Sequence, residues 1–160
     1  MSSIIKKFIC ITAVAVMFSA CAKIPQEIIS PSLSLKAGAA DEAGMVSLNF
    51  TGGLKNDNDS TVFLNVKGEV AVMDSNNNPI LLVPFDLPSI LPFETGIVQV
   101  RMEKDRGELE PLMKEMGIDF DGLVKNGESA NRFPDENKVV LKNLSLEKKG
   151  IVEILEGKMK

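Results

Sequence analysis

The sequence predicts a mainly β protein, a two-sheet β-sandwich with one packed α-helix over about residues 106–117. Two observations lead to this prediction. Short runs of alternating apolar and polar residues recur along the chain, and turn-forming Asn, Asp, Gly and Pro separate them roughly every ten residues. One later stretch has the i, i+3, i+4, i+7 apolar spacing of an amphipathic helix.

The alternation is clearest in the first half of the chain. Val46, Leu48 and Phe50 share one face of a predicted strand, which Gly52-Gly53 is expected to end or bulge. A polar turn at 55–60 leads into a second strand, and a hairpin turn at 74–79 leads into a short buried strand over 80–85. The second strand is expected to place five apolar residues on one side: Val62, Leu64, Val66, Val70 and Val72.

Prolines shape the middle of the chain. Pro84, Pro88 and Pro92 exclude a helix or a central ladder position, so this segment is expected along a sheet edge or crossing between sheets. Another strand follows over 97–102. The last strands are expected over 139–146 and 151–155.

The predicted helix presents a single apolar stripe of Leu109, Leu112, Met113 and Met116. Pro111 is tolerated in a first helical turn, and Gly117 suits a left-handed stop. Met113 and Met116, with Met102, could form an adaptable partner surface. Packing of the helix against the sheet is the favoured interpretation.

The beginning of the chain has the features of an export signal. Lys6-Lys7 precede an eleven-residue apolar run, Phe8 to Phe18, and Ser19-Ala20 supply small residues for cleavage. As a helix the run would be about 16 Å long, which is too short for a hydrocarbon core about 30 Å thick. We therefore expect an export signal rather than a membrane span.

Cys21 directly follows the small residues, so the segment resembles the signal of a bacterial lipoprotein, although Phe18 stands where that family favours Leu. The resemblance implies cleavage between Ala20 and Cys21 and acylation of Cys21, palmitate included. The alternatives are a plain secretory signal that leaves Cys21 as a free thiol, or cleavage at another position. Acylation explains an unpaired cysteine in an oxidising compartment.

Removing residues 1–20 leaves a chain the size of one domain. Residues 21–44 are expected to form a lipidated tether, because Pro25, Pro31 and the small residues 37–40 interrupt any apolar periodicity. Ser32–Lys36 remains open as a first strand. Residues 45–160 are assigned to the β-sandwich domain.

Composition excludes several classes of function. Without the two leader lysines the chain has 16 basic and 22 acidic residues, a net charge of −6, which argues against nucleic-acid binding. Histidine, tryptophan and tyrosine are absent, and Cys10 leaves with the leader. Histidine-dependent hydrolysis, histidine-ligated zinc and thiolate chemistry at an acylated Cys21 are therefore excluded. We expect no enzyme activity, no metal site and no cofactor.

Three short patterns begin like calcium loops. Asp74-x-Asn76-x-Asn78 lacks the glycine and the acid that an EF-hand needs at its sixth and twelfth positions, so a plain hairpin turn is favoured. Asp57-x-Asp59 and Asp119-x-Asp121 are better interpreted as solvated turns.

Two carboxylate pairs, Glu108 with Glu110 and Glu103 with Asp105, could in principle act as acid and base. Their place at a helix start favours capping or a solvated surface. Asp59-Ser60-Thr61 resembles the short O-glycosylation acceptor motif of the Bacteroidetes phylum, which makes Ser60 a candidate site.

Several motifs from Ser47 onward share one order of strands and turns. They are Lys55–Ser60 leading into Thr61–Val66, Gly68–Val70, Leu91–Gly96 before Ile97–Met102, and Leu112–Met116. This order resembles the late embryogenesis abundant group 2 family, also called the water stress and hypersensitive response (WHy) domain, although after Asp121 the loop Lys125–Pro134 is longer and more polar than the family pattern. The resemblance implies an immunoglobulin-like or fibronectin III-like sandwich and a non-enzymatic, stress-protective or binding role.

Together these features predict a non-enzymatic envelope lipoprotein, an anchored accessory or binding module with an envelope protein as its unknown partner. Lys23, with no aspartate after Cys21, favours the outer membrane, with the domain facing the periplasm. The alternative is a carrier of a lipid or hydrophobic small molecule in a cavity between the sheets.

Overall fold

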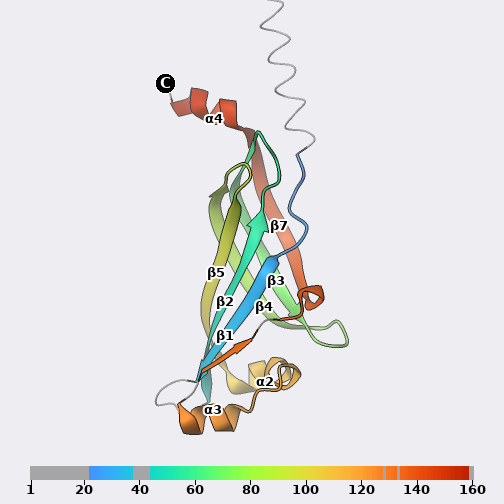
Figure 1. Cartoon of the computed structure of the whole chain (residues 1–160), viewed down its shortest axis with the longest axis vertical. Coiled ribbons are helices and arrows are strands. Elements are labelled where there is room, and N and C mark those ends of the chain that lie inside the picture. The colour runs from blue at the N-terminus through green and yellow to red at the C-terminus, as the bar shows by residue number, and fades with distance from the viewer. Residues whose placement is uncertain (1–21, 38–43, 128, 133, 159–160) are drawn as a thin grey trace, which may run out of the picture.

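The computed structural model describes residues 22–37, 44–127, 129–132 and 134–158. Two antiparallel sheets face each other (Figure 1), one in the order β5-β2-β1-β6 and the other in the order β4-β3-β7. The predicted mainly β sandwich is confirmed. The strands are β1 (Ile29–Ala37), β2 (Met45–Lys55), β3 (Thr61–Met73), β4 (Pro79–Ile90), β5 (Thr95–Asp105), β6 (Ser129–Arg132) and β7 (Val139–Gly150); the helices are α2 (Arg106–Glu115), α3 (Phe120–Asn126), the 3-10 turn η1 (Glu136–Lys138) and α4 (Ile151–Lys158).

The core lies between the sheets and is built mostly from aliphatic residues. As predicted, Val46, Leu48 and Phe50 of β2 are fully buried on one face, opposite Phe63 and other residues of β3. Burial of each such side chain stabilises the fold by about 1.5–3 kcal/mol. The inward positions of the two edge strands β4 and β7 complete this core with Leu81, Val83, Phe85, Ile90 and Val139.

The prediction for the inward face of β3 is wrong at its beginning. Asn65 has a φ of 50°, and the pairing of β3 with β7 shifts register between Leu64 and Lys67. This β-bulge inserts one residue and reverses the alternation, so Phe63 instead of Leu64 joins the core. Val62 is buried but lies outside the core cluster.

The expected tether over 21–44 is wrong for residues 29–37. These residues form β1, which pairs with β2 along its length and with β6 at Leu33–Lys36. Leu33 and Leu35 are fully buried, which explains why this stretch folds despite Pro31. The open possibility of a strand over Ser32–Lys36 is confirmed, and the strand is longer than expected.

The proline-rich segment lies at a sheet edge, as expected. Pro84 and Pro88 are in β4, an edge strand of its sheet, where a missing N–H leaves no gap in a central ladder. The predicted hairpin turn at 74–79 joins β3 to β4, and the polar turn at 55–60 joins β2 to β3.

The predicted helix is confirmed as α2. The Asp105 carboxylate accepts a hydrogen bond from the Gly107 N–H at 2.7 Å and caps its start. Gly117, with a φ of 64°, follows its end. The structure also has α3, which reaches into the polar loop expected over Lys125–Pro134, and the short strand β6 inside that range.

The prediction of a last strand over 151–155 is wrong. These residues begin α4, although Ile and Val favour strands. The Ile151 N–H donates to the Ser60 carbonyl at 2.8 Å, and the Gly150 N–H donates to the Glu153 carboxylate at 3.0 Å. These contacts end β7 and start the helix.

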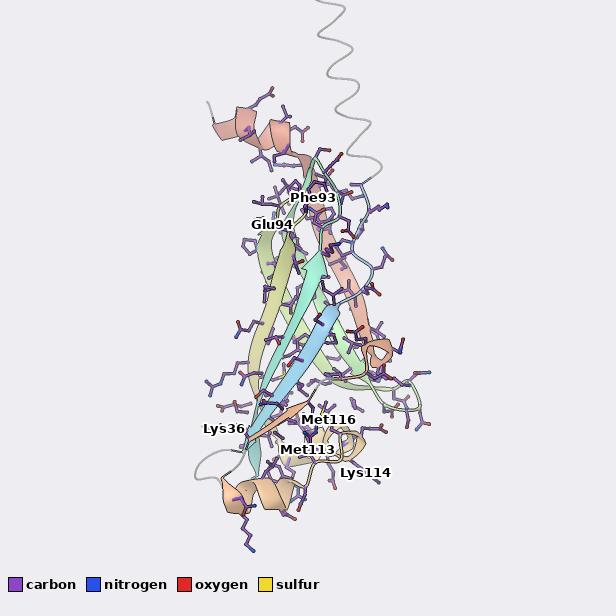
Figure 2. All side chains as sticks on the ribbon, in the orientation of Figure 1. Lys36, Phe93, Glu94, Met113, Lys114 and Met116 are labelled. Carbon is purple, nitrogen blue, oxygen red and sulfur yellow. The ribbon has the colours of Figure 1, made fainter. Side chains whose placement is uncertain are left out.

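The sandwich is elongated and has two distinct ends (Figure 1). At the upper end of the figure lie Ala22–Lys23, the loops 56–60 and 91–94, and α4. At the lower end lie α2 and α3. The same separation places Phe93 at the upper end and Met116 at the lower end in Figure 2.

Candidate functional site

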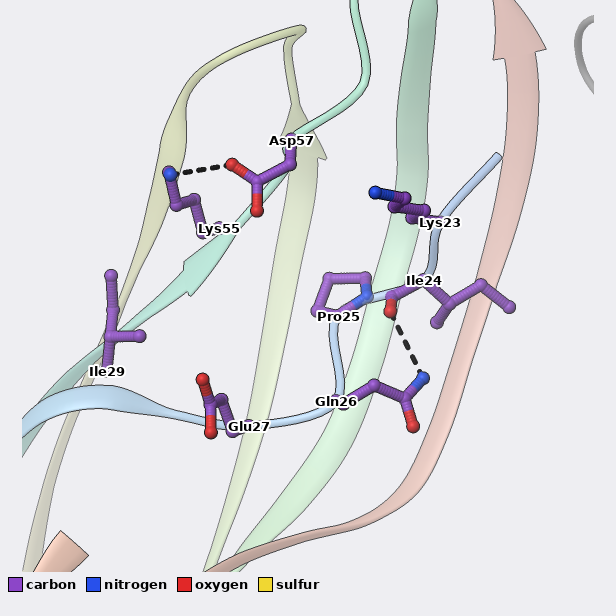
Figure 3. A pocket seen from close by; sticks show the side chains of 8 residues that line it. All are labelled: Lys23, Ile24, Pro25, Gln26, Glu27, Ile29, Lys55 and Asp57. Atoms are coloured by element: carbon purple, nitrogen blue, oxygen red, sulfur yellow. Dashed lines mark hydrogen bonds and ion pairs between the residues drawn. The ribbon is translucent and has the colours of Figure 1, made fainter. Parts of the chain in front are cut away.

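The first described residues of the chain form one wall of a groove at the upper end (Figure 3). The groove has a volume of about 440 Å³ and opens to solvent. Lys55 and Asp57 form an ion pair of 2.6 Å at its rim. Its lining residues are Lys23, Ile24, Pro25, Gln26, Glu27, Ile29, Lys55 and Asp57.

Asn58 fixes this N-terminal segment to the sandwich. Its side-chain oxygen accepts the Lys23 N–H at 2.9 Å, and its side-chain nitrogen donates to the Lys23 carbonyl at 2.9 Å. The Lys148 ammonium also reaches the Ala22 carbonyl at 3.5 Å. Ala22 and Lys23, the two residues that follow Cys21 in the sequence, are therefore held at a defined position on the upper end.

Asn56 holds the upper loops together from inside. It is fully buried, and its side-chain nitrogen donates to the Thr61, Ile90 and Leu91 carbonyls at 2.8, 3.1 and 3.1 Å. Its side-chain oxygen accepts the Asn58 N–H at 3.1 Å and the Asn58 side-chain amide at 2.7 Å. A buried amide with every hydrogen-bonding group satisfied rigidifies its surroundings.

Gly52 and Gly53 allow the N-terminal segment to lie against β2. A Cβ on Gly52 would come within 2.5 Å of Ile28 Cγ2, and one on Gly53 within 2.9 Å of Ile29 Cγ1. The expectation that this pair ends the strand is wrong, because β2 continues through to Lys55 with an unbroken register to β5. A register shift does occur opposite the pair, but its extra residue lies in β1, between Ile29 and Ser32. The glycines serve a close approach instead.

A second cavity, of about 270 Å³, lies at the lower end between α2, the start of β4 and the segment around η1. Its floor includes apolar side chains of Ile80, Leu112 and Met116. Arg132 and Lys138 bring positive charge to the rim, and Glu115 and Asp135 bring negative charge. Such a cavity suits an amphipathic ligand or a protruding apolar side chain of a partner.

The methionines occupy the positions that helix packing predicts. Met113 is buried in the core, and Met116 and Met102 are half-buried and pack against it. The favoured interpretation of core packing is confirmed. Met116 also lines the lower cavity, so one side of it faces open space.

The two candidate acid–base pairs are exposed carboxylates, and three of the four have partners within the chain. Glu108 pairs with Lys104 at 3.0 Å, and Glu103 lies 4.0 Å from Arg101. Asp105 caps α2, as the capping interpretation expects, and Glu110 is exposed.

The calcium-like patterns are also engaged within the chain. Asp74 Oδ1 accepts the N–H groups of Asn78 and Asn76, both at 2.8 Å, and the Asn78 N–H is the largest cause of a lowered Asp74 pKa. Asp57 pairs with Lys55, and Asp121 pairs with Arg106 at 2.7 Å. The hairpin-turn interpretation of 74–79 is thereby confirmed.

Ala20 and Cys21 lie outside the described residues, so cleavage and acylation there stay predictions. Ser60 is half-buried at the upper end, where its hydroxyl donates to Asp59 at 2.9 Å and its carbonyl accepts from Ile151. O-glycosylation of Ser60 also stays a prediction.

Sequence reasoning missed the roles of Asn56, Asn58, Arg132 and Lys138. The two asparagines look like ordinary residues of a polar turn, and the two cations are isolated in the sequence. The local signal for the two asparagines is that Asn56 and Asn58 lie close together directly after a strand.

The chain matches no protein-family model, and it matches neither a curated protein nor a solved structure. The resemblance to the WHy domain therefore stays a prediction. Among the described residues, no helix combines the length and the apolar character that crossing a bilayer requires.

Proposed function

We propose that this protein is a non-enzymatic envelope lipoprotein whose β-sandwich acts as an anchored binding module. Acyl chains on Cys21 hold it to a membrane, with the outer membrane favoured and the domain in the periplasm. Each buried methylene contributes about 0.8 kcal/mol, so several chains anchor a domain essentially permanently. The resemblance to the WHy domain adds a stress-protective role to the proposal.

One observation carries the proposal. The residues that follow Cys21 are fixed at the upper end by Asn58, while α2, α3 and the lower cavity lie at the opposite end. Strand β3 has 13 residues and is therefore about 40 Å long. A domain anchored through Cys21 would hold the lower cavity at about that distance from the bilayer, within reach of a partner.

The chemistry of the lower cavity defines the partner we expect. An apolar floor with mixed charges on the rim fits a protein segment that inserts one apolar side chain and pairs with Arg132 or Lys138. An envelope protein is the favoured partner. The alternative is a carrier of a lipid or hydrophobic small molecule. The packed core occupies the space between the sheets, where the ligand cavity of a carrier is expected from the sequence. A carrier would therefore use the lower cavity instead.

Anchoring is tested first. The full chain is expressed in bacteria, and the membrane fraction and the intact mass are compared for the natural chain and Cys21→Ser. The natural chain should lose residues 1–20, gain the mass of acyl chains and sediment with membranes, while Cys21→Ser should be released. An unchanged mass and unchanged membrane association of Cys21→Ser would refute the anchor.

Binding is tested in cells with a photo-crosslinking amino acid. It is placed at Met116, in the lower cavity, and as a control at Leu82, an exposed residue of β4. We expect Met116 to capture one envelope protein, and Arg132→Glu to abolish the capture. Equal capture from Leu82 would refute the assigned surface. Lipid that co-purifies with the acylated protein, and is lost in Arg132→Glu, would favour the carrier.

A further inference from the structure

The upper end of the molecule has a concentration of exposed apolar side chains. Phe93 is 69% exposed, and Leu91 beside it is also exposed. Phe93 has a φ of 60°, which is strained for a bulky residue and holds it in a tight turn. The exposed large apolar residues at this end are Ile24, Leu91, Phe93, Ile97, Ile151, Val152 and Leu155; those elsewhere in the described chain are Leu82, Val124 and Val140.

Helix α4 contributes three of these residues, Ile151, Val152 and Leu155, and each stays exposed to solvent. It projects sideways from the end of β7 (Figure 1). Val152 and Leu155, spaced three residues apart, are 59% and 56% exposed. An isolated helix of 8 residues is unstable in water, so an apolar surface against α4 would stabilise it.

The position of Ala22, the residue after Cys21, indicates which surface this end would meet. Cys21 is bonded to Ala22, whose carbonyl accepts from Lys148 at the end of β7, directly before α4. One residue spans at most about 3.6 Å. Acyl chains on Cys21 would therefore enter a bilayer beside Phe93 and α4, at a high effective concentration of lipid.

We propose that Ile24, Leu91, Phe93, Val152 and Leu155 form a membrane-contact tip that rests at the headgroup level of the bilayer, with α4 lying in the interface. The inference rests on the proposed anchoring through Cys21. Charges near the tip are mixed, so contact comes from apolar burial and needs no anionic lipid. The lysines there are Lys23, Lys55, Lys148, Lys149 and Lys158, and the acids are Asp57, Asp59, Glu94, Glu153 and Glu156.

The absence of natural tryptophan allows a direct test. Full-length Phe93→Trp, Leu155→Trp and the control Val124→Trp, in α3 at the lower end, are expressed in bacteria. The acylated proteins are reconstituted in phosphatidylcholine vesicles that contain brominated acyl chains. We expect blue-shifted, quenched emission from positions 93 and 155, and unquenched emission from position 124.

A second measurement avoids the affinity of tryptophan for interfaces. Amide exchange in α4 of the protein without added tryptophan should slow by about tenfold on vesicles, and Phe93→Ser/Leu155→Ser should lose this slowing. Unquenched emission at 93 and 155 from acylated, vesicle-bound protein would overturn the tip while leaving the anchor intact. A protein without acyl chains would overturn the anchor, and the tip with it.

Discussion

Asn58 and Lys23 are joined by two hydrogen bonds of 2.9 Å, in which one side-chain amide satisfies both backbone groups of a residue 35 positions away. This contact turns the residues after Cys21 into part of the domain. It also fixes the direction in which the chain enters the sandwich.

Asn58→Ala should release the N-terminal segment. The contact is exposed, so we expect a loss of about 1 kcal/mol or less in the free energy of unfolding. Amide exchange over Ile24–Ile28 should accelerate by about tenfold, because this segment loses its attachment. Asn76→Ala in the β3–β4 turn is the control. Unchanged exchange over Ile24–Ile28 would show that other contacts hold the segment.

Asn56→Ala should be much more damaging. The substitution leaves the Thr61, Ile90 and Leu91 carbonyls without the amide that they share inside the upper end. We expect the free energy of unfolding to fall by about 2–4 kcal/mol, measured by urea denaturation. Asn56→Asp, which keeps the shape and removes the donor, should cost a similar amount. A loss as small as that of Asn76→Ala would contradict the role given to Asn56.

Gly52→Ala should force Ile28 away from β2, because the added Cβ would meet Ile28 Cγ2 at 2.5 Å. We expect a loss of about 1–3 kcal/mol in thermal unfolding. Ile28→Ala removes the obstructing atom, so the double variant should cost less than the sum of the single variants. Gly157→Ala, where a Cβ meets open space, is the control. Strict additivity would mean that the close approach does not matter.

Asp74→Asn should alter the dependence of stability on pH. The Asp74 pKa is lowered below its ordinary value of 3.8, with the Asn78 N–H as the largest cause. Desolvation opposes this shift, while the Asn78 side chain, the Asn76 N–H and the charge of Lys138 add to it. A lowered pKa in the folded state stabilises the protein above pH 3.8, and this contribution is lost as the pH falls through the folded value. The natural chain should therefore be more stable than Asp74→Asn at pH 7. The difference between the thermal unfolding midpoints of the two proteins should be smaller at about pH 2.5 than at pH 7. A gap that stays constant would contradict this.

The sequence was sufficient for the class of fold, because period-2 alternation and turn residues are local signals. The inward face of β2, the edge position of the proline segment and the extent of α2 all follow from such signals. The predicted inward face of β3 is wrong before Asn65, because the bulge there inserts one residue and exchanges the faces on which Phe63 and Leu64 lie. The predicted strand over 151–155 is also wrong, because a long-range contact of Ile151 with Ser60 decides between strand and helix there.

The arrangement at the two ends was harder to foresee. In the sequence, Asn56 has the appearance of a solvated turn residue. It is buried because the loop at 90–91 covers it, and Ile90, which accepts its hydrogen bond, lies 34 residues further along the chain. The lower cavity combines Met116 with Arg132 and Lys138, which no local pattern connects. The pair Gly52-Gly53 stands out in the sequence, but Ile28, which packs against Gly52, is distant in sequence.

The place of β1 in the middle of its sheet has a mechanical consequence. A pull on the chain at Ala22 toward the upper end acts along the axis of β1, which is bonded to β2 on one side and to β6 on the other. Ladder hydrogen bonds run across the strands, so such a force loads many of them together in shear instead of breaking them one at a time. The force needed to unfold the domain should therefore be higher when the chain is pulled at Ala22 than when it is pulled through the edge strand β7.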